Sequence, residues 1–150
     1  DPVRALSEIL AALKPEGVLG LTTWGVDDKM PGAAIWTEEL DRAGAAPDPR
    51  DASVMRQALM DSPSKLDALL RQAGYDAIRI WQQQFAHQWT VEKLLATQTG
   101  CGAANRRMHN LSPHDRRACT DRVRARLARL TKDQLVYAPQ ILFATATRPA

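Results

Sequence analysis

Cysteine and aromatic residues are scarce in this sequence. The shortage of cysteine excludes some classes of small protein. Only two of the 150 residues are cysteines, Cys101 and Cys119, and only 5% are aromatic. Two cysteines are too few for a fold that is held together by several disulfides. Neither cysteine has a second metal-ligating residue at the short spacing of metal-binding motifs. We expect both to be reduced thiols, although the sequence leaves a disulfide between them open.

Long apolar runs are absent as well. No stretch approaches the roughly 20 residues that a membrane-spanning helix needs, which predicts no membrane span. The N-terminus runs from Asp1-Pro2 directly into an amphipathic pattern and does not resemble a signal peptide. The composition, 45% hydrophobic and 25% charged, is that of an ordinary globular domain. We therefore expect a cytoplasmic protein whose chain is long enough for one domain with a core.

Three apolar segments predict strands, and the segments between them predict helices. The strands are expected at residues 18–23, 75–85 and 140–147. The helices are expected at residues 2–13, 35–43, 48–60, 62–73, 90–95 and 112–130, most of them behind a Ser, Thr or Asp cap. The first and third strands are apolar at nearly every position, which is typical of strands covered on both faces. The fold class is therefore α/β, and the few strands indicate one part of a larger sheet.

Four short motifs stand in a recognisable order. Leu13-Lys14-Pro15-Glu16-Gly17 resembles the Leu-Lys-Pro-Gly-Gly turn before the fifth strand of class I S-adenosylmethionine-dependent methyltransferases, with Glu16 in place of the first glycine. Ala73-Gly74-Tyr75 resembles the turn before the sixth strand of that family. Ala138-Pro139-Gln140 and Arg148-Pro149 resemble the flanks of its seventh strand. The resemblance covers nearly the whole chain and is closest to small-molecule enzymes of the UbiE-like and secondary-metabolism groups.

The resemblance implies a fold and a reaction. Residues 1–150 would form the C-terminal, acceptor-side half of a Rossmann-like methyltransferase sheet, with the fifth and sixth strands and an antiparallel seventh strand between them. Residues 90–134 would form a helical insertion or lid before that last strand. The reaction would transfer a methyl group from S-adenosylmethionine to a small-molecule acceptor.

The family's cofactor-binding motifs are missing from the sequence. No Asp-x-Gly-x-Gly loop follows a strand, because Gly20 lies inside one and Gly100-Cys101-Gly102 follows a helix. No residue of this chain is therefore expected to bind the cofactor. The resemblance implies that a missing N-terminal half holds S-adenosylmethionine, and that the open sheet edge pairs either with that half or with another copy of the chain.

Three tryptophans and one histidine are the predicted site residues. Trp24 ends the first strand, where ligands of such sheets collect, and Trp36 follows shortly after it, so both are predicted to line the acceptor pocket. Trp89 is predicted to line the same pocket. His87 is the predicted general base, because an imidazole titrates near neutrality. No Cys/His/Asp cluster has metal spacing, and no Ser/His/Asp set suggests a nucleophile.

Two other functions stay open. Eight arginines lie between Arg106 and Arg129, against only Asp115 and Asp121, although the net charge is just +3. This run would suit a nucleic-acid-binding module, but the spacing favours an amphipathic helix with a solvated basic side, and no aromatic residues alternate with the arginines. The other alternative is a non-catalytic half-domain that acts as an interaction or regulatory module through its open sheet edge.

Overall fold

A computed structural model describes residues 1–26, 30–50 and 58–150. The chain divides into two compact units. The sheet unit comprises residues 1–27, 52–85 and 139–150, and the helical unit comprises residues 28–51 and 86–138. Helices and strands both occur, which confirms the α/β class. The helix predicted over residues 48–60 lies largely outside the described residues.

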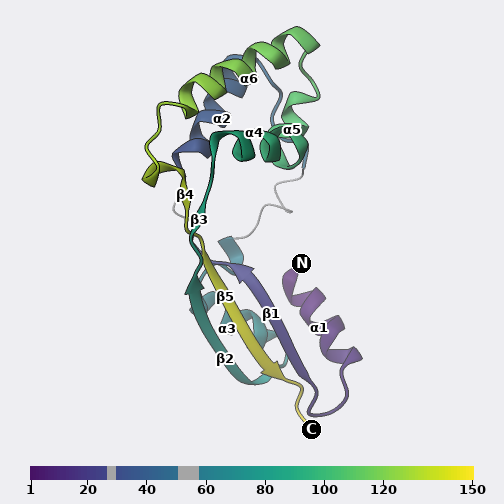
Figure 1. Ribbon diagram of the computed structural model, residues 1–150. Helices are drawn as coiled ribbons and strands as arrows, with labels where there is room; N and C mark the ends of the chain where they lie inside the picture. The colour runs from purple at the N-terminus through teal and green to yellow at the C-terminus, as the bar shows by residue number, and fades with distance from the viewer. Residues whose placement is uncertain (27–29, 51–57) are drawn as a thin grey trace. The chain divides into compact units, whose positions relative to one another are not determined.

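The sheet unit is built on three strands, which Figure 1 shows side by side. They are β1 (Val18–Trp24), β2 (Asp76–Gln84) and β5 (Gln140–Thr147), accompanied by helices α1 (Pro2–Ala12) and α3 (Pro63–Gln72). The strand order is β1-β5-β2, and β5 is antiparallel to both neighbours. Ala144 of β5 lies opposite Leu21 on one side and Ile80 on the other. The last strand in the sequence is therefore the central one.

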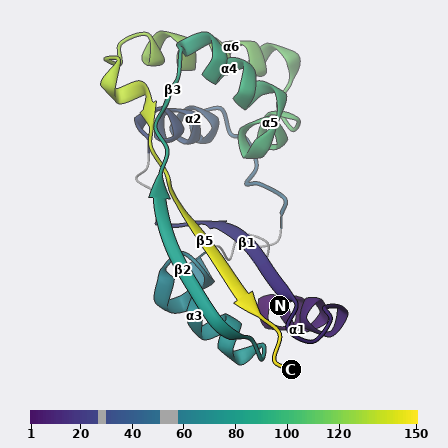
Figure 2. The ribbon, with the colours of Figure 1, turned by 60° about the horizontal axis from the view of Figure 1, so that its bottom comes forward.

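Helices α1 and α3 cover one face of this sheet (Figure 2). Side chains alternate between the two faces of a strand, so alternate residues of β5 point toward these helices. Leu142, Ala144 and Ala146 are buried, whereas the residues between them are only half-buried. Among the described residues, seven form the buried core on this side: Leu66, Leu70, Ala73, Tyr75, Leu142, Ala144 and Ala146.

The opposite face of the sheet stays open in the described part of the chain. Trp81 stacks on Phe143 with ring centroids 5.5 Å apart, yet 48% of Trp81 is exposed. Exposed and half-buried residues also alternate along β1, and Val18 and Trp24 are exposed. The prediction that the first strand is covered on both faces is therefore wrong. Its residues are apolar on both sides, but only one helical layer covers the sheet.

The family-like motifs meet at the C-terminal end of α1. The guanidinium of Arg148 donates to the carbonyls of Leu10, Ala11 and Leu13, which lie at the C-terminal end of α1. The backbone of Arg148 also bonds to Glu16 and Gly17. Tyr75 donates its hydroxyl to the carbonyl of Leu6 at 3.1 Å. These motifs hold α1 against the sheet, so their role in this chain is structural.

The turn at Glu16 and Gly17 supports a stability prediction. Glu16 has a φ of 61°, a left-handed conformation that strains any residue with a Cβ. We expect Glu16→Gly to raise the free energy of unfolding by about 0.5 kcal/mol, because the relief of strain exceeds the added chain entropy of glycine. Urea denaturation measures the change. Gly17→Ala is the opposing control and should destabilise the protein, since its Cβ would lie 2.8 Å from the carbonyl oxygen of Lys14. A loss of stability in Glu16→Gly would contradict the prediction.

In its described residues the helical unit has four α-helices around one core. They are α2 (Pro31–Arg42), α4 (Val91–Gly100), α5 (Gly102–Met108) and α6 (Pro113–Leu127). The unit also contains the short helix η2 (Asp133–Leu135) and the paired strands β3 (His87–Gln88) and β4 (Val136–Tyr137). Thr90 and Ser112 cap α4 and α6 through their hydroxyls, as predicted. Helix α2 begins four residues before its predicted start, because Pro31 suits the first helical position.

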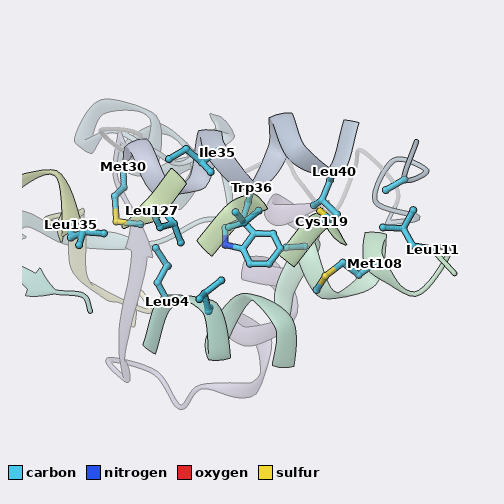
Figure 3. Close-up of a cluster of buried hydrophobic side chains, with 14 residues drawn as sticks. Met30, Ile35, Trp36, Leu40, Leu94, Met108, Leu111, Cys119, Leu127 and Leu135 are labelled. Carbon is cyan, nitrogen blue, oxygen red and sulfur yellow. The ribbon is translucent and has the colours of Figure 1, made fainter. Parts of the chain in front are cut away.

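Aliphatic and sulfur-containing side chains fill this core around Trp36 (Figure 3). Leu94, Cys119, Val123 and Leu127 come from α4 and α6 and are almost completely buried. Both cysteines are free thiols, and burial raises the pKa of the Cys119 thiol. Among the described residues, no helix is long and apolar enough to cross a membrane.

Candidate functional site

The structure brings two of the predicted site residues, His87 and Trp89, into contact. His87 lies on β3 opposite Tyr137, and its ring and the Trp89 ring form a T-shaped pair with centroids 4.6 Å apart. The imidazole is exposed, while Trp89 packs partly against the core of the helical unit. The backbone N–H of Trp89 donates to the carbonyl of Leu135 at 2.9 Å. An accessible imidazole is therefore held beside an aromatic surface, and a general base needs such access.

Trp36 lies in the middle of the helical core and is only 2% exposed. Its indole nitrogen is buried and has no hydrogen-bond partner in the described part of the chain. A buried N–H without a partner is uncommon and unfavourable. In this structure Trp36 packs the core, and an acceptor could reach it only after the surrounding helices moved.

Trp24 belongs to the other unit and ends strand β1 there. Its side chain is 48% exposed and lies opposite Ile141 on the open face of the sheet. An exposed indole at the end of a strand can stack on a ligand or on another protein surface. The structure therefore places Trp24 in the sheet unit and the other three predicted residues in the helical unit.

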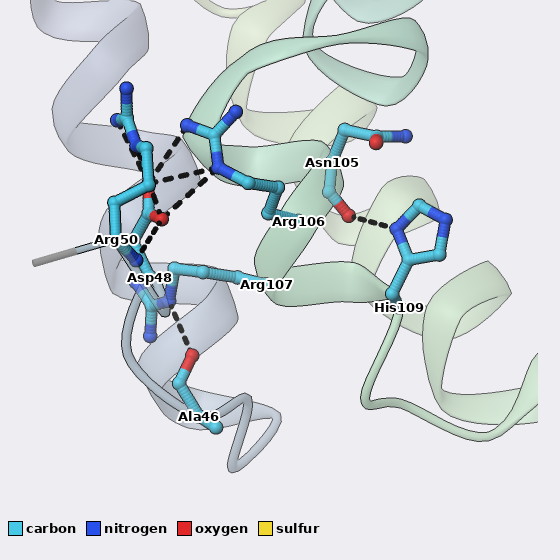
Figure 4. Close-up of polar contacts among 7 residues, drawn as sticks. All are labelled: Ala46, Asp48, Arg50, Asn105, Arg106, Arg107 and His109. Carbon is cyan, nitrogen blue, oxygen red and sulfur yellow. Dashed lines mark hydrogen bonds and ion pairs between the residues drawn. The ribbon is translucent and has the colours of Figure 1, made fainter.

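Arg106 and Arg107 of α5 form hydrogen bonds with the chain segment that follows α2 (Figure 4). Asp48 accepts hydrogen bonds from the guanidinium groups of Arg106 and Arg50, both at 2.9 Å at their closest. Hydrogen bonds from Arg106, followed by those from Arg50, hold the pKa of the Asp48 carboxyl well below its usual range. Arg107 donates to the carbonyls of Ala45 and Ala46 and to Asp41. These contacts fix residues 45–50 against α5.

A buried carboxylate joins α2 to α6. Glu39 is 2% exposed and accepts from Arg122 Nε at 2.7 Å and from Arg126 Nη1 at 3.0 Å. Arg42 lies 3.7 Å away. The hydrogen bond from Arg122 is the largest cause that lowers the pKa of Glu39, and it outweighs the opposing effect of burial. A cavity of about 340 Å³ adjoins this network and is lined by Arg42, Ala43, Asp115, Ala118 and Arg122.

The burial of Glu39 was missed in the sequence, because Glu38 and Glu39 look like ordinary surface residues of an amphipathic helix. The signal lay in α6, where Arg122 and Arg126 stand four residues apart and therefore share one helix face. Two arginines on one face require acidic partners if that face is to pack against another helix.

The arginine run is therefore largely engaged inside the helical unit. Arg106, Arg107, Arg122 and Arg126 all pair with carboxylates, and Arg124 lies 3.8 Å from Glu92. The complete helical unit carries 13 Lys and Arg against 10 Asp and Glu. Engaged guanidinium groups cannot bind phosphates without losing these pairs.

A metal site does not emerge from the part of the chain that the structure describes. No group of three or more His, Cys, Asp or Glu residues there could hold an ion. The acidic side chains instead face arginines, as at Asp48 and Glu39.

Comparison with known proteins gives only remote similarities. No family model matches the sequence, and no curated protein matches it. Among solved structures, phosphoethanolamine N-methyltransferase 2 of Haemonchus contortus, in complex with S-adenosylhomocysteine, is 12% identical with a TM-score of 0.38. The same enzyme in complex with S-adenosylmethionine is 15% identical with a TM-score of 0.37. A candidate methyltransferase of Bacillus halodurans is 14% identical with a TM-score of 0.39.

These structures are longer than the chain. The alignments cover 99–100% of its residues, but only 30% of the Haemonchus chain and 63% of the Bacillus chain. The structural neighbours are thus methyltransferases, of which the chain spans a part. At these TM-scores the similarity assigns neither a family nor a reaction.

Proposed function

We propose that this chain is the acceptor-side half of a class I S-adenosylmethionine-dependent methyltransferase that acts on a small molecule. The observation that carries the proposal is the sheet order β1-β5-β2, with the last strand antiparallel between two strands that precede it. This uncommon insertion is the arrangement that the four sequence motifs imply. In the proposal β1, β2 and β5 are the fifth, sixth and seventh strands of the family's sheet.

The proposed acceptor side includes the exposed residues that the sequence singled out. His87 would accept a proton from the acceptor, and Trp89 would provide an aromatic surface beside it, since their rings are already in contact. Trp24, exposed at the end of β1, would be a separate aromatic contact on the sheet unit. Positioning of the acceptor is expected to matter more than covalent chemistry, because methyl transfer needs no protein nucleophile.

Binding of the cofactor is expected to require a second half of the protein. The sequence lacks the glycine loop and the ribose-binding carboxylate, and β1 presents an open edge at which another strand could join the sheet. The proposed partner is therefore the missing N-terminal methyltransferase half. S-adenosylmethionine would be bound mainly by that half and would supply the methyl group.

A binding experiment tests this proposal. We expect calorimetric titration of S-adenosylmethionine into the 150-residue chain to show no micromolar binding. The same chain joined to an upstream segment that carries an Asp-x-Gly-x-Gly loop should bind the cofactor at micromolar concentration. Micromolar binding by the 150 residues alone, or no binding by the joined protein, would contradict the proposal. Circular dichroism of both samples provides the control for folding.

A second candidate function is a non-catalytic interaction module. The observation that favours it is the uncharged β1 edge, because nothing between Glu16 and Asp27 carries a charge. In this case the joined protein would bind neither cofactor nor acceptor but would still associate through β1.

A further inference from the structure

The two edges of the sheet differ in how they are protected against pairing. The β2 edge carries Asp76 and Arg79, and its register shifts between these two residues, where Ala77 has a φ of 47°. Charges and bulges of this kind prevent another strand from pairing with an edge. The β1 edge has neither device, since its seven residues are uncharged and pair with β5 in one continuous register.

The hydrogen bonds between β1 and β5 determine which backbone N–H and C=O groups of β1 point away from the sheet. Gly25 donates its N–H to Gln140, and Arg148 donates its N–H to Gly17, so odd-numbered residues of β1 bond toward β5. The N–H and C=O groups of the even-numbered residues therefore point away from the sheet. All four of these residues are exposed on its open face: Val18, Gly20, Thr22 and Trp24.

We infer that this edge pairs with the same edge of a second copy of the chain, β1 against β1 in antiparallel orientation. Outward-pointing residues must face one another, and a two-fold axis at Leu21 allows all seven residues to pair in this way. Val18 then lies opposite Trp24, and Gly20 lies opposite Thr22. The large indole therefore meets smaller neighbours, and no like charges face each other.

Helix α1 provides the second contact of this dimer. It lies on the β1 side of the sheet in both views, and none of its residues is buried. Ala5, Ile9 and Ala12 form an exposed apolar stripe at helical spacing, with Ile9 43% exposed. A two-fold axis perpendicular to the sheet brings the two α1 helices to the same face, and the small alanines allow them to approach closely. The strand edge and the helix stripe are then covered by one partner.

The self-association is measured by sedimentation velocity over a wide concentration range. We expect a monomer–dimer equilibrium in the micromolar range, since an interface of one strand and one helix is small. Thr22→Lys places a charge on the edge and should weaken the dimer at least about tenfold. Gln83→Lys is the matched control, because Gln83 is exposed on the β2 edge, and it should leave the dimer unchanged.

Hydrogen exchange of the unmodified protein tests the register. We expect the amides of Val18, Gly20, Thr22 and Trp24 to become protected as concentration rises, whereas those of Ile80 and Gln82 on the other edge do not. A monomer throughout the concentration range, equal effects of the two lysine variants, or protection confined to β2 would overturn the inference. A methyltransferase half that binds the chain should compete with the dimer, so the failure of that half to bind would count against the proposed function alone.

Discussion

Trp36→Ala is expected to lower the free energy of unfolding of the helical unit by about 3–5 kcal/mol, the usual loss when a buried tryptophan is truncated. Trp36 is 2% exposed, and side chains from α2, α4 and α6 surround it. Removing the indole leaves a cavity that these helices cannot close without losing their own contacts. Urea denaturation followed by far-ultraviolet circular dichroism measures the loss without relying on tryptophan fluorescence.

Trp24→Ala is the matched control, because it makes the same chemical change at a side chain that is 48% exposed. Its effect should stay within about 1 kcal/mol, as is usual for surface substitutions. Equal losses in the two variants would contradict the assignment of Trp36 to the core and of Trp24 to the surface.

Trp36→Phe separates packing from hydrogen bonding at the same position. The phenyl ring keeps much of the buried surface and removes an indole N–H that has no partner among the described residues. An unsatisfied buried donor costs about 1–3 kcal/mol, so its removal should offset part of the lost packing. We expect Trp36→Phe to retain most of the stability. A loss as large as that of Trp36→Ala would indicate that the indole N–H donates to a group outside the described residues.

The sequence predicted the local structure well wherever a short motif determines it. The bounds of β5 are those predicted, and the hydroxyls of Thr90 and Ser112 cap their helices as expected, by accepting from backbone N–H groups. Capping and turn chemistry depend on residues within about one helical turn, so they can be recognised from sequence alone. The order of the strands was a consequence of the family resemblance, because no local pattern places β5 between β1 and β2.

The environment of individual side chains was harder to predict. Trp24 and Trp36 both follow apolar segments, yet one is exposed and the other buried, because exposure depends on which helices pack nearby. Glu39 was missed for the same reason. Its partners Arg122 and Arg126 lie more than 80 residues further along the chain. Only the tertiary structure brings these groups together.

The network around Glu39 leads to the second large effect. Replacing both Arg122 and Arg126 by Met leaves a carboxylate that is 2% exposed without its two closest partners. A buried charge that loses its partner typically destabilises a protein by about 3–5 kcal/mol. Arg42 remains 3.7 Å away but is largely exposed, so its compensation is weak. We expect a loss of about 3 kcal/mol at pH 7, measured by urea denaturation.

The pH dependence identifies Glu39 as the group responsible. In the unmodified protein the arginines lower the pKa of Glu39 below its ordinary value of 4.5, so the native state binds fewer protons than the unfolded state in that range. This contribution to stability is fully present above about pH 4.5 and is lost as the pH falls through the lowered pKa. In the double variant burial should dominate and raise the pKa of Glu39, so its contribution should reverse and destabilise the protein as the pH rises above 4.5. Adding Glu39→Gln to the double variant removes the titrating group and should abolish the reversed dependence between pH 4.5 and 7. If the double variant kept the pH dependence of the unmodified protein, or if the added Glu39→Gln changed nothing, the carboxylate of Glu39 would not be the charge that these two arginines neutralise.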